Sequence, residues 1–408
     1  MSAGAQGSGG RVAASAQPPA CVPSPTHKGL IGSALVHDFF VAEGGGERVA
    51  LELAGLLPDA PIHTSFFDAR RFGDRIDPSR VRPWPIQRLT GPTRHFRAFL
   101  PLYPLWFSTL DLRGAGLVVS SSVAFAKAVR TGPRDVHVAY VHTPMRYAWD
   151  LDAYLRGSSF SAPSRLAART IRPALRWWDR ETARRPDVLV ANSATVRERI
   201  RRLWGRDAEV THPPVDVDEI ALSDADDGYL LVLARLLRYR RIDLAVEACT
   251  RLGRRLVVVG DGPELAGLRR LAGPAVEFRG FVPRVEAVDL LRRCHAYLVP
   301  GVEDFGIALV EAMAAGKPVV AFRAGGATET VVDGVTGVFF DAQTTDALAQ
   351  AIERLDTLSF DPAAIRAQAE RFSRAEFRRQ FTELLGRLGV DPAPAPWVHP
   401  DPSGRRAR

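Results

Sequence analysis

Residues 296–316, AYLVPGVEDFGIALVEAMAAG, decide how the rest of the chain is interpreted. An apolar run at 296–299 predicts a buried strand, and Pro300 and Gly301 end it. The small and apolar residues that follow, up to Gly316, predict a helix. Because a strand that turns into a helix leaves backbone N–H groups free at the helix start, we expect a phosphate site near residues 304–306.

Two glutamates flank this turn, Glu303 before the helix and Glu311 inside it. Eight helical residues would separate them by about 12 Å and roughly 80° of rotation. That separation exceeds the roughly 5 to 9.5 Å between paired glycosidase carboxylates, so the two acids are not expected to share one bond. It suits a ligand with hydroxyl groups at both ends and anions between them, which is the shape of a nucleotide sugar.

The spacing of Glu303 and Glu311 resembles the E-x7-E signature of retaining GT-B glycosyltransferases of family 4. The resemblance implies that Glu303 contacts the donor sugar, that Glu311 contacts the ribose, and that the backbone of residues 305–307 contacts the diphosphate. The alternative is that both glutamates lie on a solvated helix face. We favour the donor site because a strand, a glycine and free amides lie between them.

The amino-terminal half opens with an apolar run at 30–36, then His37, Asp38 and the segment 43–48, EGGGER. An amphipathic pattern follows, so we expect a strand, a glycine loop and a helix. The absence of G-x-G-x-x-G argues against a nicotinamide dinucleotide. In the family a Gly-Gly pair here lies against the donor diphosphate, and Gly44 and Gly45 match it.

The apolar run at 136–141 ends in the string YVHTPMRYAWD, residues 140–150. A histidine at the carboxyl end of a parallel strand stands where such sheets bind ligands, although a lone histidine is more often structural. His142 resembles the family histidine beside the transferred sugar. This string, with VHDFFVAEGGGERV, is similar to bacterial mannosyltransferases that build cell-surface polysaccharides; Lys127 lies in another stretch that this subgroup shares.

The second half alternates short apolar runs with helical segments, which predicts a parallel sheet covered by helices. Arg235 matches the family's diphosphate-binding arginine, and Arg240 stands where the family usually has a lysine. The alternative is that both arginines belong to a basic turn that has no role in ligand binding. The turns at 260–264 and 278–282 resemble family loops that shape the pocket. The donor-binding residues implied by the resemblance are Gly44, Gly45, Gly260, Val282, Asp304, Phe305, Gly306, Ile307 and Glu311, and the catalytic ones are His142, Arg235, Arg240 and Glu303.

Composition fits a globular protein of 408 residues, with 46% hydrophobic and 25% charged residues. The net charge of +8 suits an anionic partner. The three cysteines have no metal-ligand spacing, and no apolar run reaches the ~20 residues of a membrane span. We expect a cytoplasmic protein with reduced thiols, without a signal peptide.

Arginines recur every three or four residues from Arg165 to Arg184, near Trp177 and Trp178, so they share one helical stripe that Pro173 is expected to kink or divide. Such a stripe could attach the protein to the inner face of an anionic membrane. The alternative, a solvated face with ion pairs to neighbouring acids, has at least equal weight.

The resemblance implies a GT-B fold: two Rossmann-like parallel-sheet α/β domains that face each other across a cleft. We divide the chain into a disordered tail at 1–28, an acceptor domain at 29–213, a donor domain at 214–373, a terminal helix at 374–388 that crosses back, and a disordered tail at 389–408. Three D-x-D triplets, at 150–152, 216–218 and 224–226, are interpreted as linker or cap residues, so no metal and no cofactor are predicted.

The expected function is transfer of a hexosyl unit to a glycan or lipid-linked acceptor, with retention of configuration at the anomeric carbon. The first choice is a mannosyl unit from GDP-mannose. A different donor such as UDP-glucose, a nucleotide-sugar epimerase of the same fold, and a regulatory protein that binds a nucleotide sugar are the alternatives. No nucleic-acid motif is present, so nucleic acid is not an expected partner.

Overall fold

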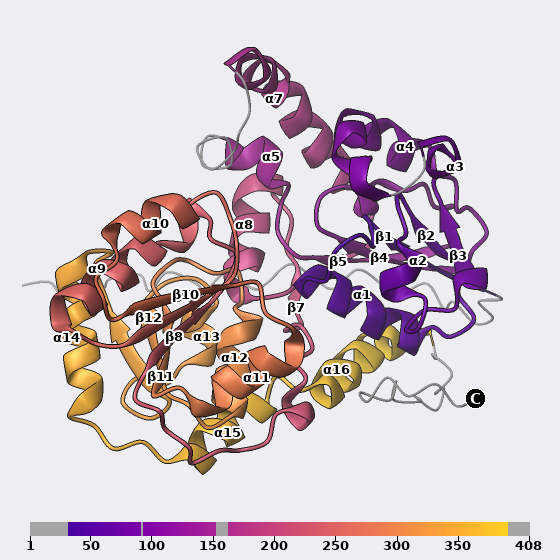
Figure 1. Ribbon diagram of the computed structural model, residues 1–408. Helices are drawn as coiled ribbons and strands as arrows, with labels where there is room; N and C mark the ends of the chain where they lie inside the picture. Colours follow the sequence, from indigo (N-terminus) through magenta and orange to yellow (C-terminus); the bar gives the residue numbers. More distant parts are fainter. Residues whose placement is uncertain (1–31, 91–92, 152–161, 391–408) are drawn as a thin grey trace, which may run out of the picture.

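A computed structural model of the chain describes residues 32–90, 93–151 and 162–390. The expected tail at 1–28, residues 391–408 of the second expected tail, Cys21 and Asp152 lie outside these residues. The described chain forms two α/β lobes, each built on its own parallel sheet (Figure 1). This confirms the fold class expected from the sequence.

The first sheet has seven strands in the order β3-β2-β1-β4-β5-β6-β7, and every neighbouring pair is parallel. Because helices cover such a sheet on both faces, its central strands are buried apolar runs. The strands are β1 Ser33–His37, β2 Ile62–Thr64, β3 Val81–Pro83, β4 Leu117–Ser122, β5 Val136–Val141, β6 Val188–Ala191 and β7 Glu209–Val210.

The second sheet has six parallel strands in the order β10-β9-β8-β11-β12-β13. They are β8 Leu230–Leu233, β9 Leu256–Val259, β10 Val276–Gly280, β11 Ala296–Val299, β12 Val319–Phe322 and β13 Gly337–Phe340. The parallel sheet that the alternating apolar runs of the second half predicted is thus confirmed. The order reverses between β8 and β11, so loops that leave these two strands meet at the point where ligands bind such sheets.

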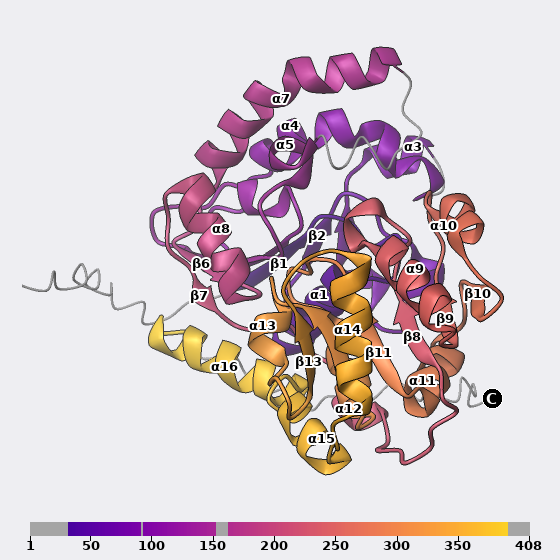
Figure 2. The ribbon, with the colours of Figure 1, turned by 90° about the vertical axis from the view of Figure 1, so that its left-hand side faces the viewer.

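Helices connect the strands and cover both sheets (Figure 2). In the first lobe they are α1 Gly45–Leu56, α2 Ala69–Phe72, α3 Ile86–Thr90, α4 Tyr103–Thr109, α5 Arg146–Trp149, α7 Ala162–Thr182 and α8 Ala194–Trp204. In the second they are α9 Ile242–Leu252, α10 Leu265–Leu271, α11 Arg284–Arg293, α12 Ile307–Ala314, α13 Ala327–Thr330, α14 Thr345–Asp356 and α15 Pro362–Glu370. The last helix, α16 Arg374–Arg387, follows them.

Helix α16 leaves the second lobe and packs on the first, beside α1 (Figure 1). Its apolar face, with Phe377, Phe381, Leu384 and Leu385, is part of the core that contains Leu35, Val49 and Val119. Within the described residues the chain therefore passes from one lobe to the other twice, between β7 and β8 and again between α15 and α16. The boundaries drawn at 213 and 373 remain predictions.

Pro173 was expected to kink or divide its helix. The helix is not divided, because α7 runs without interruption from Ala162 to Thr182 with Pro173 inside it. The stripe is also not a uniformly solvated face. Arg176 and Arg180 lie over the Trp149 ring, at 5.0 and 4.9 Å from its centroid, and donate to backbone carbonyls. The side chain of Arg165 lies outside the described structure.

Candidate functional site

The turn after β11 is shaped by glycines. Gly306 precedes α12 with φ of 98°, a left-handed conformation that other residues rarely adopt. Residues 303–305 rest against the turn after β12, where Gly326 N–H donates to the Glu303 carbonyl (2.9 Å). A Cβ atom on Gly326 would lie 2.3 Å from the Phe305 Cα atom, so only glycine fits. The pair Gly325-Gly326, in the turn after β12, is the sequence signal of this close approach, and it was not among the residues predicted to form the site.

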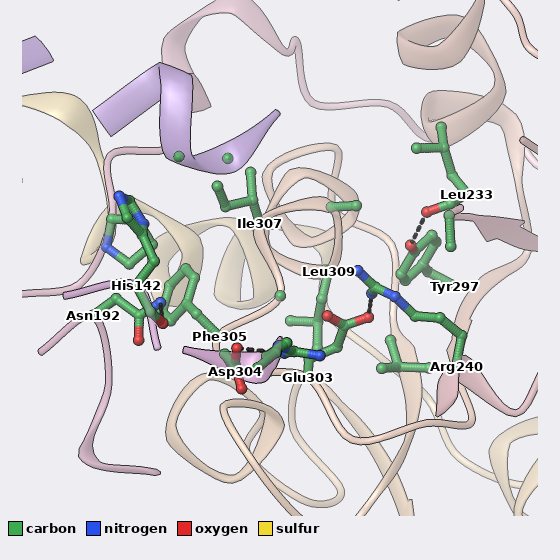
Figure 3. Close-up of a pocket in the computed structure, with 18 residues that line it drawn as sticks. His142, Asn192, Leu233, Arg240, Tyr297, Glu303, Asp304, Phe305, Ile307 and Leu309 are labelled. Atoms are coloured by element: carbon green, nitrogen blue, oxygen red, sulfur yellow. Dashed lines mark hydrogen bonds and ion pairs between the residues drawn. The ribbon is translucent and has the colours of Figure 1, made fainter. Parts of the chain in front are cut away.

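A cavity of about 280 Å³ lies between the lobes, over this turn (Figure 3). The first lobe contributes Gly45 and Gly46 from the start of α1, His142 after β5, Arg146 from α5 and Asn192 after β6. The second lobe contributes Arg240 and the turn into α12. The cavity thus lies at the carboxyl ends of both sheets.

The cavity brings together eight of the residues predicted from the sequence, namely Gly45, His142, Arg240, Glu303, Asp304, Phe305, Gly306 and Ile307. Gly44 is the residue just before α1. The other four do not line this cavity: Arg235 is exposed, Gly260 and Val282 lie at the ends of β9 and β10, and Glu311 is buried within α12. Sequence reasoning did not single out Gly46, Arg146 or Asn192.

Glu303 and Arg240 form an ion pair on one wall of the cavity (Figure 3). The guanidinium also lies over the Tyr239 ring, 5.3 Å from its centroid. The buried Arg240 Nε atom has no hydrogen-bond partner within the described structure. This wall therefore offers a carboxylate for sugar hydroxyls and a cation for an anionic leaving group.

Asp304 reaches across to the first lobe. Its Oδ2 atom accepts from Arg146 Nη2 (2.5 Å), and its Oδ1 atom accepts from Arg199 Nη1 (2.7 Å). Burial alone would raise the pKa of this carboxyl group, but the two guanidinium groups hold the pKa below its usual value. Asp304 is thus an ionised link between the lobes.

His142 faces the cavity as a neutral imidazole. Its Nε2 atom lies 2.9 Å from Ser121 Oγ, and Asn192 Nδ2 donates to its carbonyl oxygen (2.9 Å). Burial, with a smaller contribution from His37, lowers the pKa of His142 to about 3, against the opposing effect of Asp304. Its role near neutral pH is therefore hydrogen bonding and not proton release from an imidazolium.

Glu311 is ionised although it is buried. Arg48 Nη1, from α1 of the first lobe, lies 2.6 Å from its Oε1 atom, and Arg284 Nη1 lies 2.8 Å from the same oxygen. Burial would raise the pKa of Glu311, but these two arginines lower it. Neither arginine was singled out from the sequence.

The VHD string has a structural role in the first lobe. Asp38 is fully buried, and its carboxylate accepts from the backbone N–H groups of residues 123–126 at 2.5 to 2.9 Å. This bonding shapes the loop after β4, which carries Lys127. The Lys127 ammonium is buried and pairs with Asp179 (2.6 Å). These buried charges therefore hold the loop after β4 in place.

Within the described residues, no group of three or more His, Cys, Asp or Glu side chains is arranged to hold a metal ion. In the same part of the chain, every helix is too short or too polar to cross a bilayer.

Comparison with protein-family models gives two matches. Residues 43–219 match the model described as Glycosyltransferase Family 4, and residues 217–372 match the model described as Glycosyl transferases group 1. The two matches meet at residues 217–219, between the two sheets, so each lobe matches a different family model.

Curated relatives match over part of their length. A GDP-mannose-dependent alpha-(1-6)-phosphatidylinositol monomannoside mannosyltransferase of Mycolicibacterium smegmatis is 33% identical over 198 residues, which is 41% of this chain and 52% of that protein. A D-inositol 3-phosphate glycosyltransferase of the same organism is 27% identical over 248 residues, 54% of this chain and 57% of that protein. The chain thus spans a little over half the length of these relatives.

Solved structures share the fold at low identity. The complex of Anabaena HepE with UDP-glucose superposes with a TM-score of 0.64 at 20% identity, over 87% of this chain and 99% of that one. The sucrose-phosphate synthase of Thermosynechococcus elongatus gives a TM-score of 0.62 at 18% identity, over 88% of this chain and 99% of that one. Two facing parallel-sheet lobes of this kind are the GT-B glycosyltransferase fold.

Proposed function

We propose that this chain transfers a hexosyl unit from a nucleotide sugar to an acceptor with retention at the anomeric carbon, since residues 43–219 match the Glycosyltransferase Family 4 model and residues 217–372 match the Glycosyl transferases group 1 model. The observation that carries the proposal is the cavity in which His142, Glu303 and Arg240 face the glycine turn at the start of α1. A sugar hydroxyl group and an adjacent phosphate would find partners there at the same time.

The proposed reaction breaks the bond between the anomeric carbon and a diphosphate oxygen, and forms a bond from that carbon to an acceptor oxygen. The electron pair departs with the nucleoside diphosphate, whose outer phosphate then accepts the proton of the acceptor hydroxyl group. Cations and backbone N–H groups near that phosphate lower the barrier because charge develops there. We assign this role to Arg235, Arg240 and the amides after Gly44.

Glu303 would orient the sugar by accepting from its hydroxyl groups, and His142 would hold the sugar from the opposite lobe. The neutral state of His142 suits this role, since a neutral imidazole can accept as well as donate. The ionised Glu311 would accept from the ribose hydroxyl groups. Gly260 and Val282, at the ends of neighbouring strands, would border the nucleobase.

We favour GDP-mannose as the donor, since one matching relative is named as a GDP-mannose-dependent enzyme. HepE, which shares the fold, was crystallised with UDP-glucose, so this is the competing donor. Thermal unfolding with a panel of nucleotide sugars discriminates between them, because a ligand that binds only the native state raises the Tm. We expect GDP-mannose to give the largest rise; a larger rise with UDP-glucose would overturn this choice.

Substitution of Glu303 tests the enzymatic role. We expect Glu303→Gln to lower kcat by about 100-fold, because it removes a charge at the reacting sugar while it keeps the shape of the side chain. Arg235→Ala should lower kcat by a similar factor. Glu353→Gln, on the exposed side of α14, is the matched control. Full activity in both site variants would contradict the assignment.

Two other functions fit the same fold. An epimerase would convert the nucleotide sugar without an acceptor, so product analysis in the absence of acceptor identifies it. A regulatory protein would bind the nucleotide sugar and transfer nothing to any acceptor. We place both behind the transferase because the two matching family models describe glycosyltransferases and the matching relatives are named as transferases.

The acceptor would be a glycan or a lipid-linked sugar, and we propose that α7 attaches the protein to an anionic membrane. Leu166 and Trp177 on this helix are both 67% exposed, beside the arginine stripe. Co-sedimentation with vesicles of phosphatidylglycerol should fall severalfold in a Trp177→Gln variant. Binding that is unchanged would show that the stripe is a solvated surface, and neutral vesicles provide the control.

A further inference from the structure

Helix α1 approaches the second lobe at two places. Its first residue, Gly45, lines the cavity, and one turn later Arg48 reaches Glu311 of α12 with a distance of 2.6 Å between Nη1 and Oε1. A backbone hydrogen bond connects Arg48 to the glycine turn, since Arg48 N–H donates to the Gly44 carbonyl (3.1 Å). Any movement of this helix relative to the second lobe therefore changes both contacts together.

Glu311 receives one arginine from each lobe. Arg284, at the first position of α11, lies in the same lobe as Glu311, whereas Arg48 comes from the other lobe. Both of these contacts are made to Oε1 of Glu311. The Glu311 side chain is only 3% exposed, and a buried carboxylate needs such partners to remain ionised.

The contacts of Arg48 continue to the helix that crosses between the lobes. Asp216 Oδ2 lies 4.0 Å from Arg48 Nη1, and Asp216 Oδ1 lies 3.3 Å from Arg374 Nη1 of α16. Arg374 Nε in turn donates to Glu52 Oε2 of α1 (2.9 Å). Acidic and basic groups thus alternate from Glu311 to the start of α16.

We propose that Arg48 is a positioning residue that couples nucleotide binding at Glu311 to closure of the two lobes. The inference rests on the proposed function, which places the donor ribose at Glu311. With the lobes apart, Glu311 would keep only Arg284, and its carboxylate would be less firmly held. With the lobes together, Arg48 holds the carboxylate in one orientation, in which it would accept from the ribose hydroxyl groups.

Linkage makes this coupling reciprocal. If closure improves the hold of Glu311 on the ribose, then ribose binding must favour closure by the same factor. A nucleotide without ribose hydroxyl groups should therefore bind more weakly and close the lobes less. The ribose hydroxyl groups and Arg48 should act as a coupled pair, which is measurable by removing each one separately and both together.

The experiment measures the Kd of GDP and of 2′,3′-dideoxy-GDP by calorimetry, in the wild-type protein and in Arg48→Gln. We expect the variant to bind GDP about tenfold more weakly and dideoxy-GDP almost as well as the wild type, so that the ratio of the two Kd values shrinks. Arg197→Gln is the control, because Arg197 forms an exposed pair with Asp207, which keeps Arg201 as a second partner. Its two Kd values should stay unchanged.

Small-angle X-ray scattering provides a second readout that does not depend on activity. GDP should reduce the radius of gyration of the wild type, and the reduction should be smaller in Arg48→Gln. Arg48→Lys, which keeps the charge, should restore part of the Kd ratio and is measured in place of Arg48→Gln if that variant does not fold. An unchanged Kd ratio, or tighter GDP binding because Arg48 competes with the ribose, would overturn the inference.

The outcomes separate this inference from the function on which it rests. If the wild type binds neither GDP nor UDP, the proposed function fails. If the wild type binds UDP and not GDP, the same comparison is made with UDP and dideoxy-UDP. If a nucleotide binds but the Kd ratio is the same in the wild type and in Arg48→Gln, only the proposed coupling is contradicted.

Discussion

At the scale of single residues, the buried charges of the first lobe hold its loops in place. Lys127 Nζ donates to Asp179 Oδ1 (2.6 Å) and lies 5.1 Å from the centroids of the Trp178 and Trp204 rings. Asp179 Oδ2 also accepts from the indole N–H of Trp149 (2.7 Å). The structure thus places Lys127, whose role could not be inferred from the sequence, in the core of the first lobe.

We predict that Lys127→Met lowers the free energy of unfolding by about 3 kcal/mol, because it leaves the Asp179 carboxylate buried without its cation. Urea unfolding measures the change. Arg113→Gln breaks an exposed pair with Asp111 and should change stability by less than about 0.5 kcal/mol. A loss of similar size in the two variants would contradict a special role for the buried pair.

Glu47 makes stability depend on pH. Burial, and then the carboxylates of Asp38 and Glu43, raise the pKa of Glu47 to about 7, although the N–H groups of Glu47 and Gly44 oppose the shift. The folded protein therefore keeps this proton at pH values where the unfolded chain has lost it, so stability falls as pH rises. Relative to Glu47→Gln, the wild type should lose on the order of 3 kcal/mol of unfolding free energy between about pH 4.5 and 7. Urea titrations across that range test this, and a constant difference would contradict it.

At the scale of elements, the strands were predictable because nearly every one is a short buried apolar run. Three edge strands are the exceptions: β7 and β10 have no buried residue, and β3, Val81–Pro83, lies in an Arg- and Pro-rich segment whose layout did not follow from the sequence. Only Val81 of its three residues is buried. Strand β3 is short and lies at the edge of the sheet, so it forms by pairing with β2. Its sequence shows neither the alternation nor the apolar content that would predict a strand.

The loop after β9 gives a prediction at this scale. Gly260 has φ of 129°, and a Cβ atom there would lie 1.9 Å from the Ala234 carbonyl oxygen. We expect Gly260→Ala to cost about 3 kcal/mol of stability through strain and overlap. A Cβ atom added to Gly267, inside α10, would meet no neighbour within 4 Å, so Gly267→Ala should be neutral or stabilise by up to about 1 kcal/mol. Chemical denaturation compares the two, and equal effects would contradict the argument.

The site was predictable only where it is local in sequence. Glu303 and Glu311 could be paired because both flank one turn, and the glycines at 44–45 could be matched by their motif. The arginines that hold these acids could not, since Arg48 lies 263 residues from Glu311, and Arg146 lies 158 residues from Asp304. In a chain with 54 basic residues, no local pattern distinguishes these partners.

At the scale of the whole molecule, α16 makes the first lobe depend on the end of the chain. We predict that Phe381→Ala lowers the free energy of unfolding by about 3 to 5 kcal/mol, because Phe381 is fully buried in the core of the first lobe. Calorimetry should show the loss in the transition of that lobe. Leu271→Ala, at a residue that is 44% exposed, is the control. A loss confined to the second lobe would contradict the packing.

The two places where the chain passes between the lobes lie side by side. Val215 N–H donates to the Phe372 carbonyl (3.0 Å), and Val215 and Ser373 form a parallel bridge. Two adjacent connections resist twisting and sliding of one lobe on the other, yet permit rotation about a line that runs through them. The lobes are therefore expected to open along one angular coordinate, and a single distance between two labels placed on opposite rims of the cavity would report that coordinate completely.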